Sequence, residues 1–218
     1  MFRLLATLCL LPALGVASII QFVSLPSNTE HGTYNGFLSA VIDGQQWNLV
    51  CDDYGHTTNV PSGSLTYHES DLLAFSPLQY ARFVTPGGPT LYDISLYRQA
   101  ALLVEGMLDT GPSHSPDLTA DYQYALWHLF DPSVPLWRTV QQDLLTHTAS
   151  EVQNNSAAHA NLYAALRIYT PSGQYVGNQE FLGLQSVPEP GSLLLAGLAI
   201  GLLFLGSRRR GAVENRPS

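Results

Sequence analysis

The residue with the most distinctive chemistry is Cys51. The chain has two cysteines, and Cys9 lies in an apolar N-terminal segment that we expect to be removed. Exported proteins usually pair their cysteines or avoid them. A single remaining thiol therefore indicates an intermolecular bond or a thiol that is used in chemistry. The alternative is a buried cysteine that packs as a small apolar side chain, and the cysteine count alone favours it.

A second group of polar and aromatic residues lies in the predicted helix from Asp121 to Phe130, which reads Asp-Tyr-Gln-Tyr-Ala-Leu-Trp-His-Leu-Phe. Its core, Gln-x-Ala-Leu-Trp beginning at Gln123, resembles the TQxA motif of surface thioester domains. Those domains also carry an upstream Cys before an acidic residue, as in Cys51-Asp52. The run Ala-Leu-Trp-His-Leu-Phe-Asp-Pro further resembles a group of PEP-CTERM proteins. The motif's Thr is replaced by Tyr122, which removes a hydroxyl beside the glutamine.

The resemblance implies that the Cys51 thiol displaces ammonia from the Gln123 amide and leaves an internal thioester. An amine or hydroxyl on a target surface would then become attached through Gln123. The reaction needs a group that lowers the thiol pKa or accepts its proton, and we expect a supporting shell for it. That shell comprises Asp52, Trp127 and His128, with His56 as a further proton acceptor.

Simpler interpretations of these residues stay open. At helical spacing, Ala125, Trp127 and Phe130 are typical of a core-facing stripe. Asp52, Asp53 and His56 could bind a divalent cation, but an acidic turn is favoured because their spacing matches no EF-hand loop. A Cys51–His128–Asp131 hydrolase lacks a Gly-rich nucleophile turn. We therefore expect no enzyme, no metal site and no cofactor.

The strands and helices expected from the sequence position these residues and indicate an α+β fold. It consists of an antiparallel β-sheet or sandwich with a central helical insertion, plus one C-terminal transmembrane helix. A first strand is expected at 19–23, and Asp43-Gly44 predicts a hairpin that ends at Cys51. Helices are expected at 92–108, 118–130 with Asp117 as cap, 135–150 and 156–165. Strands 166–170 and 174–184 should follow, joined as a hairpin.

Both ends of the chain carry targeting patterns. Residues 1–17 form a short basic start, an apolar run and small residues, which is typical of a cleaved signal peptide. Near the other end, an uncharged apolar segment 191–207 approaches the about 17–25 residues that a membrane helix needs. Short motifs flank it: Val187, Pro188, Glu189 and Pro190 before it, and Arg208, Arg209 and Arg210 after it.

This order resembles the PEP-CTERM sorting signal. The resemblance implies that an integral-membrane exosortase recognises and cleaves the tail during export; an ordinary C-terminal anchor is the alternative. The arginines mark the cytoplasmic side. The predicted organisation is thus a signal peptide (1–17), an extracytoplasmic α+β domain (18–186), a sorting signal (187–210) and a short cytoplasmic tail (211–218). The chain would be anchored in the inner membrane, then reach the cell surface or extracellular matrix.

The net charge of the chain indicates which classes of partner it can bind. The chain has a formal net charge of −8, and its basic residues are all arginines. Such an acidic surface argues against nucleic acid. The expected partners are the exosortase, the membrane through the C-terminal helix, and a surface polysaccharide or protein target. We expect an exported surface or matrix protein that attaches covalently through Cys51 and Gln123, or a structural or adhesive protein of the same fold without that bond.

Overall fold

The computed structural model describes residues 17–26, 28–72, 78–109 and 116–185. The described strands and helices lie in a compact unit that ends at Gln185. Strands come first, helices follow and two strands close the order, as the sequence predicted. The elements are β1 (Ala17–Ser24), β2 (Asn28–Glu30), β3 (Thr33–Asn35), β4 (Leu38–Ile42), β5 (Gln45–Cys51), β6 (Leu65–Ser70), α1 (Leu91–Asp109), α2 (Pro116–Phe130), α3 (Thr139–Asn154), α4 (Ala160–Ala165), β7 (Leu166–Pro171), a 3₁₀ turn η1 (Gly173–Tyr175) and β8 (Phe181–Leu184).

Six strands form a closed barrel in the order β1-β4-β5-β8-β7-β6. Every pairing in it is antiparallel, and β1 pairs with both β4 and β6 to complete the circle. The expected α+β class with an antiparallel sheet is confirmed, but the sheet closes on itself instead of forming an open sheet or sandwich. Closure leaves none of these six strands with an unpaired edge.

The β4–β5 hairpin is the local feature that the sequence predicted best. Asp43 and Gly44 both adopt positive φ, 49° and 86°, as a two-residue turn of this type requires. The turn sets the register, with Ile42 opposite Gln45 and Leu38 opposite Leu49. That register places Cys51 at the end of β5.

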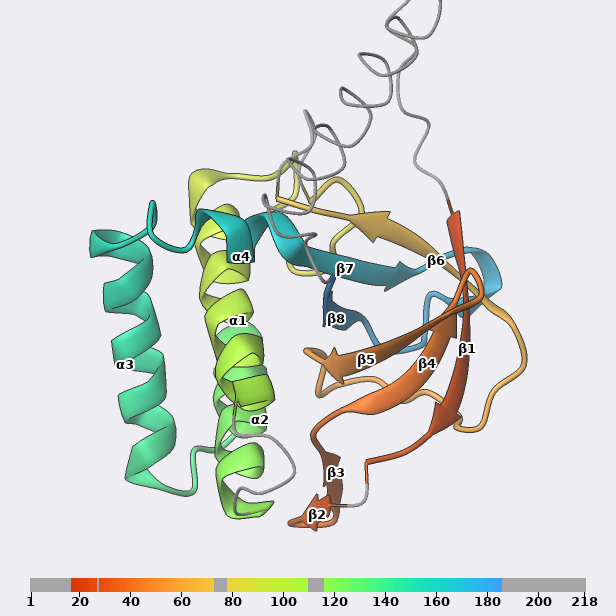
Figure 1. The fold of residues 1–218 in the computed structure, drawn as a ribbon, viewed down its shortest axis with the longest axis horizontal. Helices are drawn as coiled ribbons and strands as arrows, with labels where there is room; N and C mark the ends of the chain where they lie inside the picture. Colours follow the sequence, from red (N-terminus) through yellow and green to blue (C-terminus); the bar gives the residue numbers. More distant parts are fainter. Residues whose placement is uncertain (1–16, 27, 73–77, 110–115, 186–218) are drawn as a thin grey trace, which may run out of the picture. The chain divides into compact units, whose positions relative to one another are not determined.

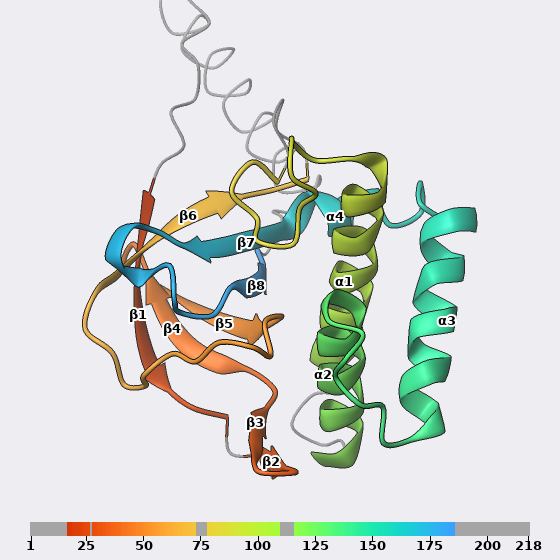
Figure 2. The same ribbon diagram turned by 180° about the vertical axis from the view of Figure 1, so that it is seen from behind.

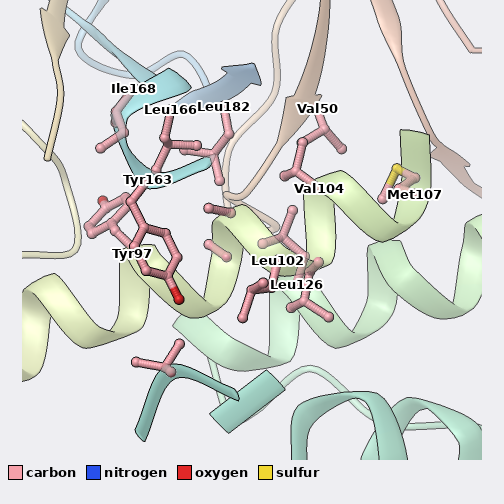
Figure 3. Close-up of a cluster of buried hydrophobic side chains, with 14 of the residues drawn as sticks. Val50, Tyr97, Leu102, Val104, Met107, Leu126, Tyr163, Leu166, Ile168 and Leu182 are labelled. Carbon is pink, nitrogen blue, oxygen red and sulfur yellow. The ribbon is translucent and has the colours of Figure 1, made fainter. Parts of the chain in front are cut away.

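Alternation along the strands separates two apolar clusters. Leu49, Cys51 and Phe181 belong to the cluster inside the barrel. Their neighbours Val50 and Leu182 point the other way, into the cluster shared with the helices (Figure 3). Because successive side chains of a strand face opposite sides, β5 contributes to both cores at once.

The helices cover one side of the barrel, with α1 and α2 next to the strands and α3 on the outside (Figures 1 and 2). The central helical insertion is thus confirmed. Close approach of α1 and α2 depends on Gly106, where an added Cβ would lie 2.5 Å from the Tyr122 ring. Tyr122, the residue that replaces the motif's Thr, therefore packs against α1.

Some predicted boundaries were wrong. Helix α3 begins at Thr139, not Pro135. The Gln141 side-chain oxygen caps its start by accepting from the backbone N–H groups of Trp137 over 2.7 Å and Arg138 over 3.3 Å. Asp117 lies inside the first turn of α2 and is not its cap. Strands β7 and β8 pair antiparallel as expected. Strand β8 begins only at Phe181, because the 3₁₀ turn and an irregular segment take the place of the expected tight turn. The short β2–β3 hairpin was not predicted.

The targeting segments lie largely beyond the described residues. The predicted signal peptide reaches Ala17, which is the first residue of β1, and cleavage there stays a prediction. The predicted membrane helix 191–207 and the motifs around it fall in the undescribed C-terminal part. Within the described ranges, no helix combines the length and apolarity needed to cross a bilayer.

Candidate functional site

An open pocket of about 600 Å³ brings Cys51 and Gln123 together. Its walls come from the β2–β3 region, the end of β5, the loop that follows β5, and α2. Trp127, one turn beyond Gln123 on the same helix, also lines it. With His56, the pocket therefore gathers four of the residues that the sequence singled out, from segments far apart in the chain.

Backbone groups hold the side-chain amide of Gln123 in one orientation. Its Nε2 donates to the Cys51 carbonyl over 2.7 Å, and its Oε1 accepts from the Gly36 N–H over 3.3 Å. The residue is 1% exposed. The amide carbonyl is thus fixed and polarised by a donor, and the amide nitrogen is held by the backbone carbonyl of Cys51.

Gly36 is a residue whose backbone conformation serves this contact. Its φ of +101° is one that residues with a Cβ rarely adopt, and an added Cβ would lie 3.1 Å from Thr119 Cγ2 on α2. A glycine therefore lets the chain between β3 and β4 pass close to α2 and present its N–H to Gln123.

The Cys51 thiol is buried and hydrogen-bonded locally. Its Sγ accepts from the Asp53 N–H over 3.3 Å and donates to the Asp53 carbonyl over 3.1 Å. Burial, the largest cause, raises the pKa of the Cys51 thiol well above its usual value. The thiol is therefore protonated at neutral pH, and a reaction at Cys51 needs a proton acceptor.

The indole nitrogen of Trp127 is a polar atom at the pocket. This Nε1 is buried and makes no hydrogen bond of ordinary geometry with the described residues. Trp127 lines the same pocket as Cys51, and its N–H partly offsets the rise in the thiol pKa. Edge contacts with the rings of Tyr54 and Tyr124 fix the indole, with centroids 5.1 and 5.3 Å apart. Trp127, expected in the supporting shell, thus brings an indole N–H into the surroundings of the Cys51 thiol.

Asp52 lies in a buried cluster of acidic and hydroxyl groups. Glu180 accepts hydrogen bonds from the Tyr97 hydroxyl over 2.5 Å, from the Arg82 backbone N–H over 2.7 Å and from Thr170. Burial, followed by the charge of Glu180, raises the pKa of Asp52 well above its usual value. Since Glu180 receives the donors, Asp52 is the member of the pair that keeps a proton.

Asp53 connects the loop after β5 to the rest of the site. Arg82 forms an ion pair with its carboxylate, and His56 Nδ1 lies 2.9 Å from its Oδ1. Arg82 also donates to the carbonyls of Val176 and Asn178, each over 2.8 Å. The arginine therefore ties the segment before β8 to the loop that carries His56.

His128 is held away from Cys51 by a different partner. Its Nδ1 lies 2.7 Å from the Val134 carbonyl, and it is not among the described residues that line the pocket.

The hydrolase and metal-site alternatives concern other residues. The Asp131 carboxylate accepts from the backbone N–H and the hydroxyl of Ser133. The described residues contain no group of three metal-ligating side chains suited to a metal ion.

Gly36, Arg82 and Glu180 contribute to the site although the sequence did not single them out. The Asn35-Gly36 dipeptide signals a residue at positive φ, so Gly36 could have been found as a turn, though not as a donor to Gln123. No local pattern marks Arg82 or Glu180, because their partners are distant in the sequence: 29 residues separate Arg82 from Asp53.

Comparison with known proteins concerns the end of the chain. Residues 186–210 match the PEP-CTERM protein-sorting motif. This motif identifies an exported protein that an exosortase sorts and that is anchored transiently at the membrane. No curated protein and no solved structure matches the chain. The match lies outside the pocket and bears on sorting alone.

Proposed function

We propose that the exported domain forms an internal thioester between Cys51 and Gln123 and uses it once to attach covalently to a target. The supporting observation is the contact of 2.7 Å between Gln123 Nε2 and the Cys51 carbonyl, inside a pocket that both side chains line. The residues that resemble a thioester domain in sequence thus meet in space, although 72 positions separate them.

The proposed reaction joins two side chains that line the same pocket. The Cys51 sulfur attacks the side-chain carbonyl carbon of Gln123, the carbon–nitrogen bond breaks, and ammonia leaves with the thiol proton. The Gly36 N–H, which binds the amide oxygen in the resting state, would stabilise the charge that develops there. The Trp127 N–H would stabilise the sulfur as it loses its proton.

The products suit an attachment role better than turnover. A nucleophile from a target would attack the thioester carbonyl, form a stable bond to Gln123 and release the thiol. The chain has no lysine, so no internal side-chain amine competes, and arginine is not nucleophilic at neutral pH. Each chain would react once, which is why we propose an attachment protein and not an enzyme.

Intact mass spectrometry tests the proposal on the protein purified after export. The expected mass is lower than the sequence mass by one ammonia molecule, with no free thiol at Cys51. Methylamine should then add to Gln123 and expose the thiol. Cys51→Ser is the matched control, because it keeps a side chain of similar shape but should show the full mass. A full mass and a free thiol in the wild-type protein would refute the thioester.

A second function, a structural or adhesive surface protein without the bond, is favoured by one observation. Both ends of the Gln123 amide are already satisfied by backbone groups, as expected for a buried glutamine that joins β5 to α2. In that case Cys51 and Gln123 stabilise the packing, and the exported domain interacts through its surface. The same mass measurement separates the two functions.

The sorting motif supports a proposal for the path of the chain. Residues 1–17 would be removed as a signal peptide and 18–186 would fold outside the cytoplasm. The helix 191–207 would hold the chain in the inner membrane, with 211–218 on the cytoplasmic side, until the exosortase cleaves near Pro188-Glu189-Pro190. Replacing Arg208, Arg209 and Arg210 with serine should impair this orientation. Unchanged processing in export assays would contradict the proposed topology.

A further inference from the structure

The loop after β5 places a second reactive side chain at the pocket that holds Cys51 and Gln123. His56 lines this pocket, and its Nδ1 lies 2.9 Å from Asp53 Oδ1. The Asp53 side chain is 3% exposed and also binds the Arg82 guanidinium and the Gly55 N–H. A carboxylate fixed in this way orients the imidazole.

The contact determines which ring nitrogen is free. In the neutral imidazole, the Asp53 oxygen accepts the hydrogen bond from Nδ1, so that Nε2 carries the lone pair. No hydrogen bond within the described residues occupies Nε2, and the His56 side chain is 43% exposed. Charged and titratable groups around this imidazole are Asp53 and Arg82, together with Tyr54 of the same loop and Cys51 of the pocket.

The remaining lining of the pocket indicates the chemistry of its ligand. No Asp or Glu is among the described lining residues, so a cationic amine would find no counter-charge there. Uncharged hydrogen-bonding side chains line it instead, including Thr57, Asn59 and Gln179. Tyr34 and Tyr54 present rings that are 51% and 43% exposed. Apolar faces beside neutral donors and acceptors fit a polyhydroxylated ligand, such as a carbohydrate, better than a lysine side chain.

We infer that His56, oriented by Asp53, is the general base that activates a carbohydrate hydroxyl for attack on the Cys51–Gln123 thioester. The inference rests on the proposed function. The hydroxyl proton passes to His56 Nε2 as the oxygen bonds to the Gln123 carbonyl carbon. The carbon–sulfur bond then breaks, and the Cys51 thiolate takes the proton back from His56. An ester joins Gln123 to the sugar, and the imidazole is neutral again.

The test compares two nucleophiles on the exported protein: methyl glucoside as the hydroxyl probe and methylamine as the amine probe. Intact mass is measured before either is added, so the presence of the thioester is known first. His56→Gln should keep the thioester and slow the glucoside adduct by about 100-fold or more, the usual contribution of a general base. The methylamine rate should change little, since an unprotonated amine needs no base to attack.

Further variants separate a catalytic role from a structural one. The glucoside rate of His56→Ala should recover in added imidazole. His159→Gln is the matched control: His159 also pairs with a carboxylate, Glu151, over 3.1 Å, but does not line the pocket. It should leave both rates unchanged.

Three results would overturn the inference. An unchanged glucoside rate in His56→Gln would exclude the general base. An equal loss with both nucleophiles would show that His56 only supports the structure. A wild-type protein without the thioester at the first mass measurement would refute the proposed function itself, and this outcome is distinguishable because it precedes the addition of any nucleophile.

Discussion

Replacing Gly36 with alanine perturbs the contact on which the proposed chemistry depends. The φ of +101° costs a residue with a Cβ about 1–2 kcal/mol. The new Cβ would also lie 3.1 Å from Thr119 Cγ2, and crowding of a packed site costs about 1–3 kcal/mol. We therefore expect Gly36→Ala to lower the free energy of unfolding by about 2–5 kcal/mol in total.

Two further variants divide this cost into its parts. Gly44 also has a positive φ, +86°, but nothing lies within 4 Å of its added Cβ. Gly44→Ala should therefore cost only the backbone part, about 1–2 kcal/mol. Thr119→Ser removes the methyl group that the new Cβ meets. The Gly36→Ala/Thr119→Ser double variant should thus recover most of the crowding part, which is a measurable coupling between the two sites.

Urea unfolding followed by tryptophan fluorescence measures these differences, and intact mass measures the thioester in the same samples. Gly36→Ala should lower the fraction of chains that have lost ammonia, because the N–H no longer reaches Gln123 Oε1 as it does at 3.3 Å in the native protein. Equal destabilisation by Gly36→Ala and Gly44→Ala, without coupling to Thr119→Ser, would refute the steric argument. Thioester content that stays at the wild-type level would refute the role of the N–H.

Three other predictions follow from the same site. Because burial raises the pKa of Asp52, the folded chain keeps a proton that the unfolded chain loses above about pH 4. The contribution of this proton to the free energy of unfolding is fully present below that pH. It is lost, by up to about 1.4 kcal/mol per pH unit, as the pH rises through the pKa of Asp52 in the folded chain. Asp52→Asn should flatten this slope in urea unfolding between about pH 4 and pH 8, and an unchanged slope contradicts the assignment. Trp127→Phe should slow thioester formation by about 10-fold, the loss of one donor to the sulfur, while circular dichroism stays native; an unchanged rate argues against that donor. Gly106→Ala should lower stability by about 1–3 kcal/mol despite the better helix propensity, since its Cβ would meet the Tyr122 ring; a more stable variant in thermal unfolding would show that the ring moves freely.

Features that depend on neighbouring residues could be predicted from the sequence. The turn at Asp43-Gly44, the helix over Tyr92 to Leu108 and the sorting motif at the C-terminus each follow from a short pattern of residue types. The turn was predictable because two residues at positive φ set the strand register by themselves. The boundary of α3 was missed because its start depends on the Gln141 side chain, which accepts from the backbone N–H groups of Trp137 and Arg138, and not on the nearby Pro135.

The sequence by itself determined the export signal pattern, the order of strands and helices, and the types of residue able to react. Only the tertiary structure decided that the strands close into a barrel, that the Gly36 N–H reaches Gln123 across 87 positions, and that Asp53 orients His56 at the pocket that Cys51 lines. The physical reason is that local patterns report the backbone preferences of adjacent residues. Contacts between distant segments depend instead on how the barrel and the helices share their buried apolar faces.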